Sequence, residues 1–197
     1  MSATNRAAGK AFRILKVALP VALVGGLGFM TFRPATTTAA LQANARAPQF
    51  VTQGAIGGKV FTLDLRKQLA KGPVVLYFFP KAFTKGCTLE TAAFAENHDR
   101  FSAAGATVIG MSADNIADLQ RFSTEVCRSK FPVAIATSRI MQAYDVKLPA
   151  VNMTNRTSFV IAADGRIAYV HSDMNYVDHV RNTLAAVERL KTRPARR

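Results

Sequence analysis

The chain has 197 residues, of which 49% are hydrophobic and 19% are charged, and its formal net charge is +14. This length and hydrophobicity exclude intrinsic disorder over most of the chain and are typical of one globular domain with an additional segment. The presence of only two cysteines excludes a disulfide-dense scaffold and a four-cysteine zinc site.

The positive charge is concentrated at the two ends of the chain. Residues 1–49 contain six basic and no acidic residues, and residues 189–197 contain five basic and no acidic residues. The stretch between them holds 15 basic and 12 acidic residues, a net charge of +3. A strongly basic chain is typical of proteins that bind nucleic acid or anionic lipid, so this class of binding protein is considered first. The nearly balanced centre, which has no basic stripe interleaved with aromatic residues, argues against nucleic acid and leaves this class as an alternative.

The first 33 residues predict an export signal. Four cations precede an uncharged apolar run, Val17–Phe32, and this order is typical of a signal peptide. As a helix the run spans roughly 24 Å, which is short of the ~30 Å hydrocarbon core. We expect a signal peptide over residues 1–33, with an N-terminal membrane anchor as the alternative. The protein is therefore expected to be exported, and to be periplasmic, secreted after cleavage or anchored to the membrane.

A folded domain is predicted over residues 50–191, between a linker at residues 34–49 and a basic tail at residues 192–197. Alternating apolar and polar residues predict a half-exposed strand at Lys59–Leu65. A continuous apolar run predicts a buried central strand at Pro73–Phe79. A helix over Cys87–Ala104 and a second buried strand over Thr107–Met111 are expected next. Asp114 is the predicted N-cap of the amphipathic helix that follows.

The second half of this domain continues the alternation. Strands are predicted at Phe131–Ile135 and Ser158–Ala162, with a short helix between them. The Asp-Gly dipeptide at residues 164–165 predicts a hairpin into Arg166–His171. A final amphipathic helix is expected over Tyr176–Lys191. Helices that alternate with buried strands, followed by an antiparallel pair, predict an α/β fold, a three-layer α/β/α sandwich with a mixed central sheet. A thioredoxin-like arrangement fits this order.

Cys87 lies where the first long helix is expected to begin, after the buried strand and Pro80. Unpaired backbone N–H groups and the positive end of the helix dipole stabilise an anion, so this position favours the nucleophilic thiolate. Thr84, three residues earlier, is close enough to place a hydroxyl beside the sulfur. Pro80 is expected to end the strand and to shield the site from bulk water.

The segment Tyr77–Glu90, YFFPKAFTKGCTLE, carries the pattern Pro80-x-x-x-Thr84-x-x-Cys87. This is the peroxidatic motif of the peroxiredoxins, and the surrounding sequence resembles the bacterioferritin-comigratory-protein (PrxQ) branch over roughly residues 50–190. The resemblance implies a thiol-dependent peroxidase with a thioredoxin-like fold. Such an enzyme reduces hydrogen peroxide or organic hydroperoxides, takes electrons from a thioredoxin-like or other dithiol reductant, and needs no cofactor and no metal.

The resemblance also assigns roles to individual residues. Cys87 would attack the O–O bond and become a sulfenic acid. Thr84 would hydrogen-bond the sulfur and the incoming peroxide. Arg156 would hold the thiolate charge and stabilise the charge that develops on the peroxide oxygens. Glu90 would lie in the first turn of the helix, where a carboxylate interacts favourably with the dipole, and its part in catalysis is left open.

Cys127 is the one candidate within the chain for the resolving cysteine. Many members of the branch carry that cysteine five residues after the first, where this chain has Ala92. Because Cys127 lies at the far end of the helix that follows Asp114, a disulfide with Cys87 would require the helix ends to unravel. The neighbouring cations, Arg128 and Lys130, would favour its thiolate. The alternative is a buried apolar filler without a redox role.

An exported thioredoxin-like thiol-disulfide oxidoreductase would share the fold, but the chain lacks a Cys-x-x-Cys at the helix start. The three histidines are expected to be solvated or core residues, because no spacing among them and the cysteines indicates a metal site. They are His98, His171 and His179.

Overall fold

The computed structural model describes residues 41–192. The predicted signal peptide or anchor at residues 1–33, the first part of the predicted linker and the tail from residue 193 onward lie outside the described residues. Within residues 41–192, no helix is both long enough and apolar enough to cross a membrane.

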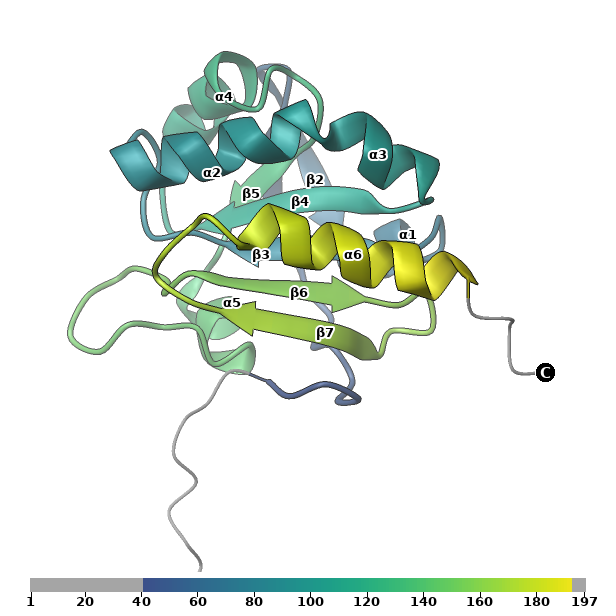
Figure 1. The fold of residues 1–197 in the computed structure, drawn as a ribbon. Coiled ribbons are helices and arrows are strands. Elements are labelled where there is room, and N and C mark those ends of the chain that lie inside the picture. The colour runs from purple at the N-terminus through teal and green to yellow at the C-terminus, as the bar shows by residue number, and fades with distance from the viewer. Residues whose placement is uncertain (1–40, 193–197) are drawn as a thin grey trace, which may run out of the picture. The chain divides into compact units, whose positions relative to one another are not determined.

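One mixed sheet of seven strands forms the centre of the domain (Figure 1). The strands in chain order are β1 Val51–Ile56, β2 Lys59–Asp64, β3 Val74–Phe78, β4 Thr107–Ser112, β5 Val133–Ile135, β6 Thr157–Ile161 and β7 Ile167–Ser172. Their order across the sheet is β2-β1-β5-β4-β3-β6-β7. Strand β3 pairs in parallel with β4 and antiparallel with β6, which places it inside the sheet.

Helices cover both faces of this sheet. The described helices are α1 Leu65–Leu69, α2 Lys85–Glu96, α3 His98–Ala103, α4 Ile116–Glu125, α5 Ser138–Ala143 and α6 His179–Thr192. Buried residues of α2, α3, α4 and α6 form one hydrophobic cluster with the sheet, and those of α1 and α5 form the other. The predicted three-layer α/β/α fold with a mixed sheet is confirmed.

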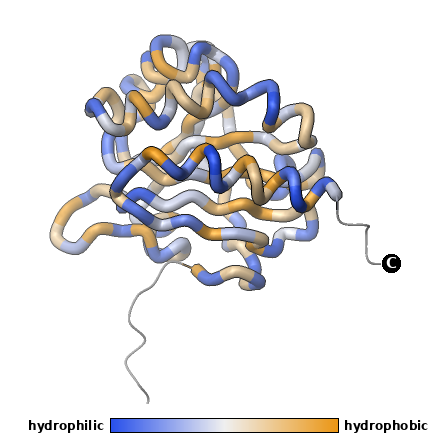
Figure 2. The backbone as a smooth tube through the Cα atoms, in the orientation of Figure 1, coloured by the Kyte–Doolittle hydropathy of each residue, from blue (hydrophilic) through white to orange (hydrophobic). Residues whose placement is uncertain are grey.

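The sequence of β3 explains how one strand supports both layers. All five of its residues are buried, and successive side chains point to opposite faces. Val75 and Tyr77 join the cluster under α2, whereas Val74, Leu76 and Phe78 join the cluster under α1 and α5. The outer helix α6 differs from this fully buried strand, because only one of its faces is covered by the sheet. Hydrophobic and hydrophilic residues therefore alternate along it, as Figure 2 shows.

Several element boundaries differ from the predicted ones for local reasons. The helix predicted over Cys87–Ala104 begins at Lys85 and is interrupted at Asn97, which ends α2 and precedes α3. The last helix begins at His179 rather than Tyr176, because the Asp173 and Asn175 side chains accept backbone N–H groups two residues ahead and form turns.

Two elements and one packed segment were absent from the sequence prediction. Strand β1 contains Gly54 and two polar residues, and α1 has only five residues, so neither carries a strong periodic signal. Residues 41–49, assigned to a linker by the sequence, instead pack on the domain. Ala47 is buried, and the backbone of Asn44 and Ala47 donates to the carbonyls of Ile167 and Gly165. The domain therefore begins before residue 50.

Candidate active site

Cys87 is the third residue of α2, which begins immediately after β3 and a short loop. Thr84 is the N-cap residue, and the first intrahelical bond runs from the N–H of Thr88 to the carbonyl of Thr84 at 2.8 Å. The N–H groups of the three preceding residues, Cys87 included, belong to the set that has no acceptor within a helix. Residue Cys87 is only 1% exposed, so the helix dipole acts on a sulfur that is shielded from water.

Arg156 brings a fixed positive charge to the sulfur. Its Nη2 lies 3.5 Å from Cys87 Sγ, its Nη1 donates to Glu90 Oε2, and its Nε donates to the carbonyl of Met174 at 3.0 Å. The side chain is 5% exposed, and it comes from the residue just before β6, the antiparallel neighbour of β3. The fold thus brings Cys87 and Arg156 together from 69 residues apart in the chain, and the role of Arg156 toward the thiolate stays a prediction.

Gly86 makes room for this contact. A Cβ atom at position 86 would lie 3.3 Å from Arg156 Nη2, closer than such contacts ordinarily are. The glycine of the KGC sequence therefore lets the guanidinium approach the first turn of α2.

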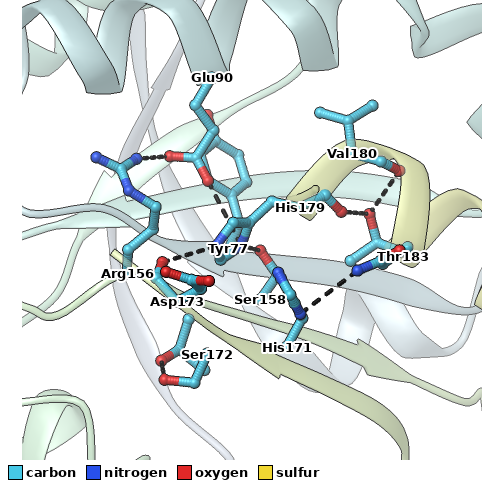
Figure 3. A network of polar contacts seen from close by, with 12 residues as sticks. Tyr77, Glu90, Arg156, Ser158, His171, Ser172, Asp173, His179, Val180 and Thr183 are labelled. Atoms are coloured by element: carbon cyan, nitrogen blue, oxygen red, sulfur yellow. Dashed lines mark hydrogen bonds and ion pairs between the residues drawn. The ribbon is translucent and has the colours of Figure 1, made fainter. Parts of the chain in front are cut away.

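Glu90 lies one turn after Cys87, fully buried beneath Arg156. Burial raises the pKa of Glu90 to about 8, even though Arg156 acts in the opposite direction. Its two oxygens differ in environment, as Figure 3 shows. Oε2 pairs with Arg156, whereas Oε1 has no hydrogen-bond partner in the described part of the chain and lies 3.6 Å from Nδ1 of His179.

Among the described residues the hydrogen bond predicted between Thr84 and the sulfur is not formed, whereas the predicted contact of Thr84 with the peroxide stays a prediction. The Thr84 hydroxyl donates to the carbonyl of Lys81 at 2.9 Å, so its proton is used within the loop and is not directed at the sulfur. The physical reason is the extended backbone of an N-cap residue, from which a threonine side chain reaches a carbonyl three residues back. The oxygen lone pairs stay available to accept a proton from a peroxide. Pro80 follows β3 as predicted, and its shielding role stays a prediction.

Asp114 is not the N-cap of α4. That position belongs to Asn115, whose side chain accepts the N–H of Asp118 at 2.9 Å. Asp114 instead accepts the backbone N–H of Ala82 at 2.7 Å and the hydroxyl of Ser112 at 2.8 Å. It thereby fixes the loop between β3 and α2 to the end of β4.

Cys127 is fully buried in the same hydrophobic cluster as Cys87, and both cysteines are free. The expectation that Arg128 and Lys130 favour its thiolate is wrong. Arg128 pairs with Glu96, Lys130 lies 3.7 Å from Asp99, and burial raises the pKa of the Cys127 thiol. A thiol in this apolar setting is unreactive while the fold stays closed.

A second layer of polar residues behind Arg156 was not found from the sequence (Figure 3). Ser158 Oγ lies 2.8 Å from Nδ1 of His179, and Nε2 of the same ring lies 2.9 Å from the carbonyl of Asp173. The Tyr77 hydroxyl lies 3.0 Å from Thr91 Oγ1 beneath α2. The one signal in the sequence was a histidine, His179, on the buried face of the last helix. Its acidic neighbour Glu90 is 89 positions away in the chain, so the contact could not be predicted from local sequence.

No group of three or more histidine, cysteine, aspartate or glutamate side chains is placed to hold a metal ion within residues 41–192. The nucleophile, the cation and the shielded helix start together define a site for thiolate chemistry.

Comparison with known proteins agrees with this assignment. The model of the AhpC/TSA family matches residues 43–170. Peroxiredoxin Bcp of Escherichia coli K12 is 31% identical over 153 residues, which cover 71% of this chain and 90% of that relative. The chloroplastic peroxiredoxin Q of Oryza sativa subsp. japonica is 28% identical over 123 residues, 60% of this chain and 55% of that protein. The crystal structure of peroxidoxin BcpB from Mycobacterium tuberculosis superposes with a TM-score of 0.69 at 26% identity, covering 78% of this chain and 99% of that one.

The fold and the cysteine site define a thiol peroxidase. The chain belongs to the AhpC/TSA family and, within it, to the Bcp/PrxQ branch of the peroxiredoxins.

Proposed function

We propose that Cys87 reduces hydrogen peroxide or a small organic hydroperoxide, with Arg156 as the residue that stabilises the reacting charge. The observation that supports this most directly is the 3.5 Å approach of Arg156 Nη2 to Cys87 Sγ at the start of α2. The thiolate attacks one peroxide oxygen, the S–O bond forms and the O–O bond breaks. The released alkoxide or hydroxide takes up a proton and leaves as an alcohol or water, and Cys87 becomes a sulfenic acid.

The test is the stoichiometry of peroxide consumption. Cys87→Ser is expected to abolish it, because a serine hydroxyl is not ionised at neutral pH and cannot accept oxidation to a sulfenic acid. Cys127→Ser is the matched control, and it is expected to consume one equivalent of peroxide per chain without added reductant. Activity retained by Cys87→Ser would contradict the assignment.

Cys127 is the residue proposed to resolve the sulfenic acid. It lies just beyond α4, where Arg128 and Ser129 both adopt left-handed backbone conformations with φ of 52° and 57°. Such conformations cost free energy in residues other than glycine, which makes this segment a favourable place for local opening. Opening would bring Cys127 into water, where its thiolate can attack Cys87, displace water and form the disulfide. A thioredoxin-like dithiol would then return both cysteines to the thiol form.

Mass spectrometry of the peroxide-treated protein distinguishes this route from a one-cysteine cycle. An intramolecular Cys87–Cys127 bond gives a mass loss of two hydrogens and disappears in Cys127→Ser. Sulfenic acid at Cys87 that persists in the wild-type protein under the same conditions would exclude Cys127 as the resolving residue.

The export proposal rests on the sequence of residues 1–33, with the periplasm or the membrane surface as the destination. Its support is the basic segment followed by Val17–Phe32. Cell fractionation combined with the N-terminal mass of the mature protein tests it. Full-length protein recovered from the cytoplasm would contradict it.

A further inference from the structure

Glu90 and His179 form a buried contact that the peroxidase chemistry described above leaves unused. Both side chains are fully buried, and Nδ1 of His179 lies 3.6 Å from Oε1 of Glu90. That oxygen has no hydrogen-bond partner among the described residues. A buried carboxylate oxygen without a hydrogen-bond donor costs free energy. Binding of a proton at or beside this oxygen would remove that cost.

The neighbours of His179 determine which of its nitrogens can carry a proton. Nε2 faces the carbonyl of Asp173 at 2.9 Å, and because a carbonyl only accepts, Nε2 carries a hydrogen. In the neutral ring Nδ1 is then an acceptor, and it receives the hydroxyl of Ser158 at 2.8 Å. An ionised Glu90 would therefore present a negative oxygen to a nitrogen lone pair. One proton placed on either atom removes this conflict.

We propose that Glu90 and His179 bind one proton between them, and that this proton sets the net positive charge that Arg156 presents to the sulfur of Cys87. With the proton bound, Arg156, Glu90 and His179 together carry one positive charge. Without it, the carboxylate cancels the guanidinium and the trio is neutral. His179 is thus a positioning residue that acts on the nucleophile through Glu90 and Arg156.

The environment of the pair favours retention of this proton near neutral pH. Burial raises the pKa of Glu90 to about 8 and lowers the pKa of His179 to about 4, so the proton resides mainly on the carboxyl group. The other titratable groups that face the pair are Tyr77 of β3, His171 of β7 and Asp173 at the end of that strand. The pKa of Tyr77 is raised well above its ordinary value by burial, so this side chain stays neutral.

A double-mutant cycle in the full chain tests the proposal. Its readout is the pH midpoint of Cys87 alkylation by iodoacetamide, with the alkylated Cys87 peptide quantified by mass spectrometry. His179→Gln offers an amide donor to Glu90 and keeps it ionised, so the midpoint is expected to rise by about one unit or more, the effect of losing one nearby positive charge. Glu90→Gln fixes the trio at one positive charge and is expected to keep the wild-type midpoint. The double variant Glu90→Gln/His179→Gln is expected to return to it as well.

His171→Gln is the matched control, because this ring packs on His179 with the two ring centroids 4.5 Å apart but is not among the groups that shift the pKa of Glu90. It is expected to leave the midpoint unchanged. A double variant that keeps the shift of His179→Gln, a rise caused by Glu90→Gln, or an equal rise caused by His171→Gln would overturn the proposal. A merely structural role of His179 would not be reversed by a second substitution.

NMR of the unsubstituted, reduced protein gives an independent measurement if His179→Gln fails to fold. The Glu90 carboxyl carbon and the His179 Nδ1 signals are expected to titrate with one common midpoint. Separate midpoints, or no titration of either signal between pH 5 and 10, would overturn the proposal. The proposal uses Cys87 as its reporter and so rests on the proposed function, but alkylation requires no peroxide. Loss of peroxidase activity and loss of the proton coupling are therefore distinguishable.

Discussion

The carboxylate of Asp114, at the end of β4, accepts the backbone N–H of Ala82 at 2.7 Å. This bond spans 32 residues and ties the loop that precedes Cys87 to a neighbouring strand. The same oxygen accepts the Ser112 hydroxyl at 2.8 Å, so the carboxylate is itself held in place. The position of the nucleophile therefore depends on a residue outside the peroxidatic motif.

Asp114→Ala is expected to destabilise the protein by about 1–3 kcal/mol, because the Ala82 N–H loses a charged acceptor. Peroxide consumption is expected to slow as the loop loosens. Chemical denaturation and stopped-flow kinetics measure the two effects. Asp118→Ala, in the partly exposed first turn of α4, is the matched control and is expected to cost less than about 1 kcal/mol. Equal losses in the two variants would show that the loop contact is not important.

Arg156→Lys tests whether geometry matters at this position as well as charge. A lysine ammonium is a single point donor, whereas Arg156 contacts Cys87, Glu90 and the Met174 carbonyl through three different nitrogens. Loss of one such preorganised contact is expected to lower kcat/KM for peroxide on the order of 10²-fold. The exposed Arg121, changed to Lys, is the control. A lysine variant with wild-type kcat/KM would show that charge alone suffices.

The pH dependence of stability should report the buried Glu90 and His179 pair. The folded protein holds Glu90 with a raised pKa of about 8 and His179 with a lowered pKa of about 4, against ordinary values of 4.5 and 6.5. Between pH 4.5 and 6.5 the folded and unfolded pairs each hold one proton, so their contributions cancel. Between pH 6.5 and 8 only the folded pair holds one, and stability falls as pH rises.

The expected size of this alkaline loss is roughly 2 kcal/mol, since a single proton changes the free energy of unfolding by about 1.4 kcal/mol per pH unit. Below pH 4.5 the unfolded pair holds two protons and the folded pair holds one, so stability falls as the pH is lowered. Urea denaturation between pH 4 and 9 measures the profile. Subtracting the profile of Glu90→Gln/His179→Gln isolates the pair, and a difference that rises between pH 6.5 and 8 would contradict the assignment.

Gly110→Ala addresses the packing that supports α2 from below. A Cβ atom at position 110 would lie 2.7 Å from the Tyr77 hydroxyl, and this ring is stacked 4.3 Å from that of Phe94. The ring cannot move freely, so the substitution is expected to destabilise the protein by about 1–3 kcal/mol. Adding Tyr77→Phe removes the nearest atom and is expected to recover part of the loss. Thermal unfolding measures both variants, and an unchanged Tm for Gly110→Ala would disprove the clash.

The strands and helices with strong periodic patterns could be predicted from local sequence. A strand buried on both faces, such as β3, has a continuous apolar run, whereas a helix buried on one face, such as α4, has apolar residues at helical spacing. Each pattern therefore indicates its element directly. Strand β1 and the packed segment at residues 41–49 were missed. Strand β1 has no strong periodic pattern of its own and is held by pairing with both its neighbour β2 and the distant β5, whereas residues 41–49 are held by distant partners such as the turn at Gly165.

The sequence by itself determined that Cys87 lies at the start of a helix, because a strand, a proline and a helix signal follow one another within a few residues, and the motif around it carries the resemblance to the peroxiredoxins. Only the tertiary structure decided what surrounds the sulfur. Antiparallel pairing of β3 with β6 brings Arg156 to Cys87, and α6 lays His179 against Glu90. Likewise, the charges beside Cys127 predicted a reactive thiol, and burial overrode them. Local spacing fixes which groups lie on one helix, whereas long-range packing fixes the dielectric surroundings and charge partners that control their chemistry.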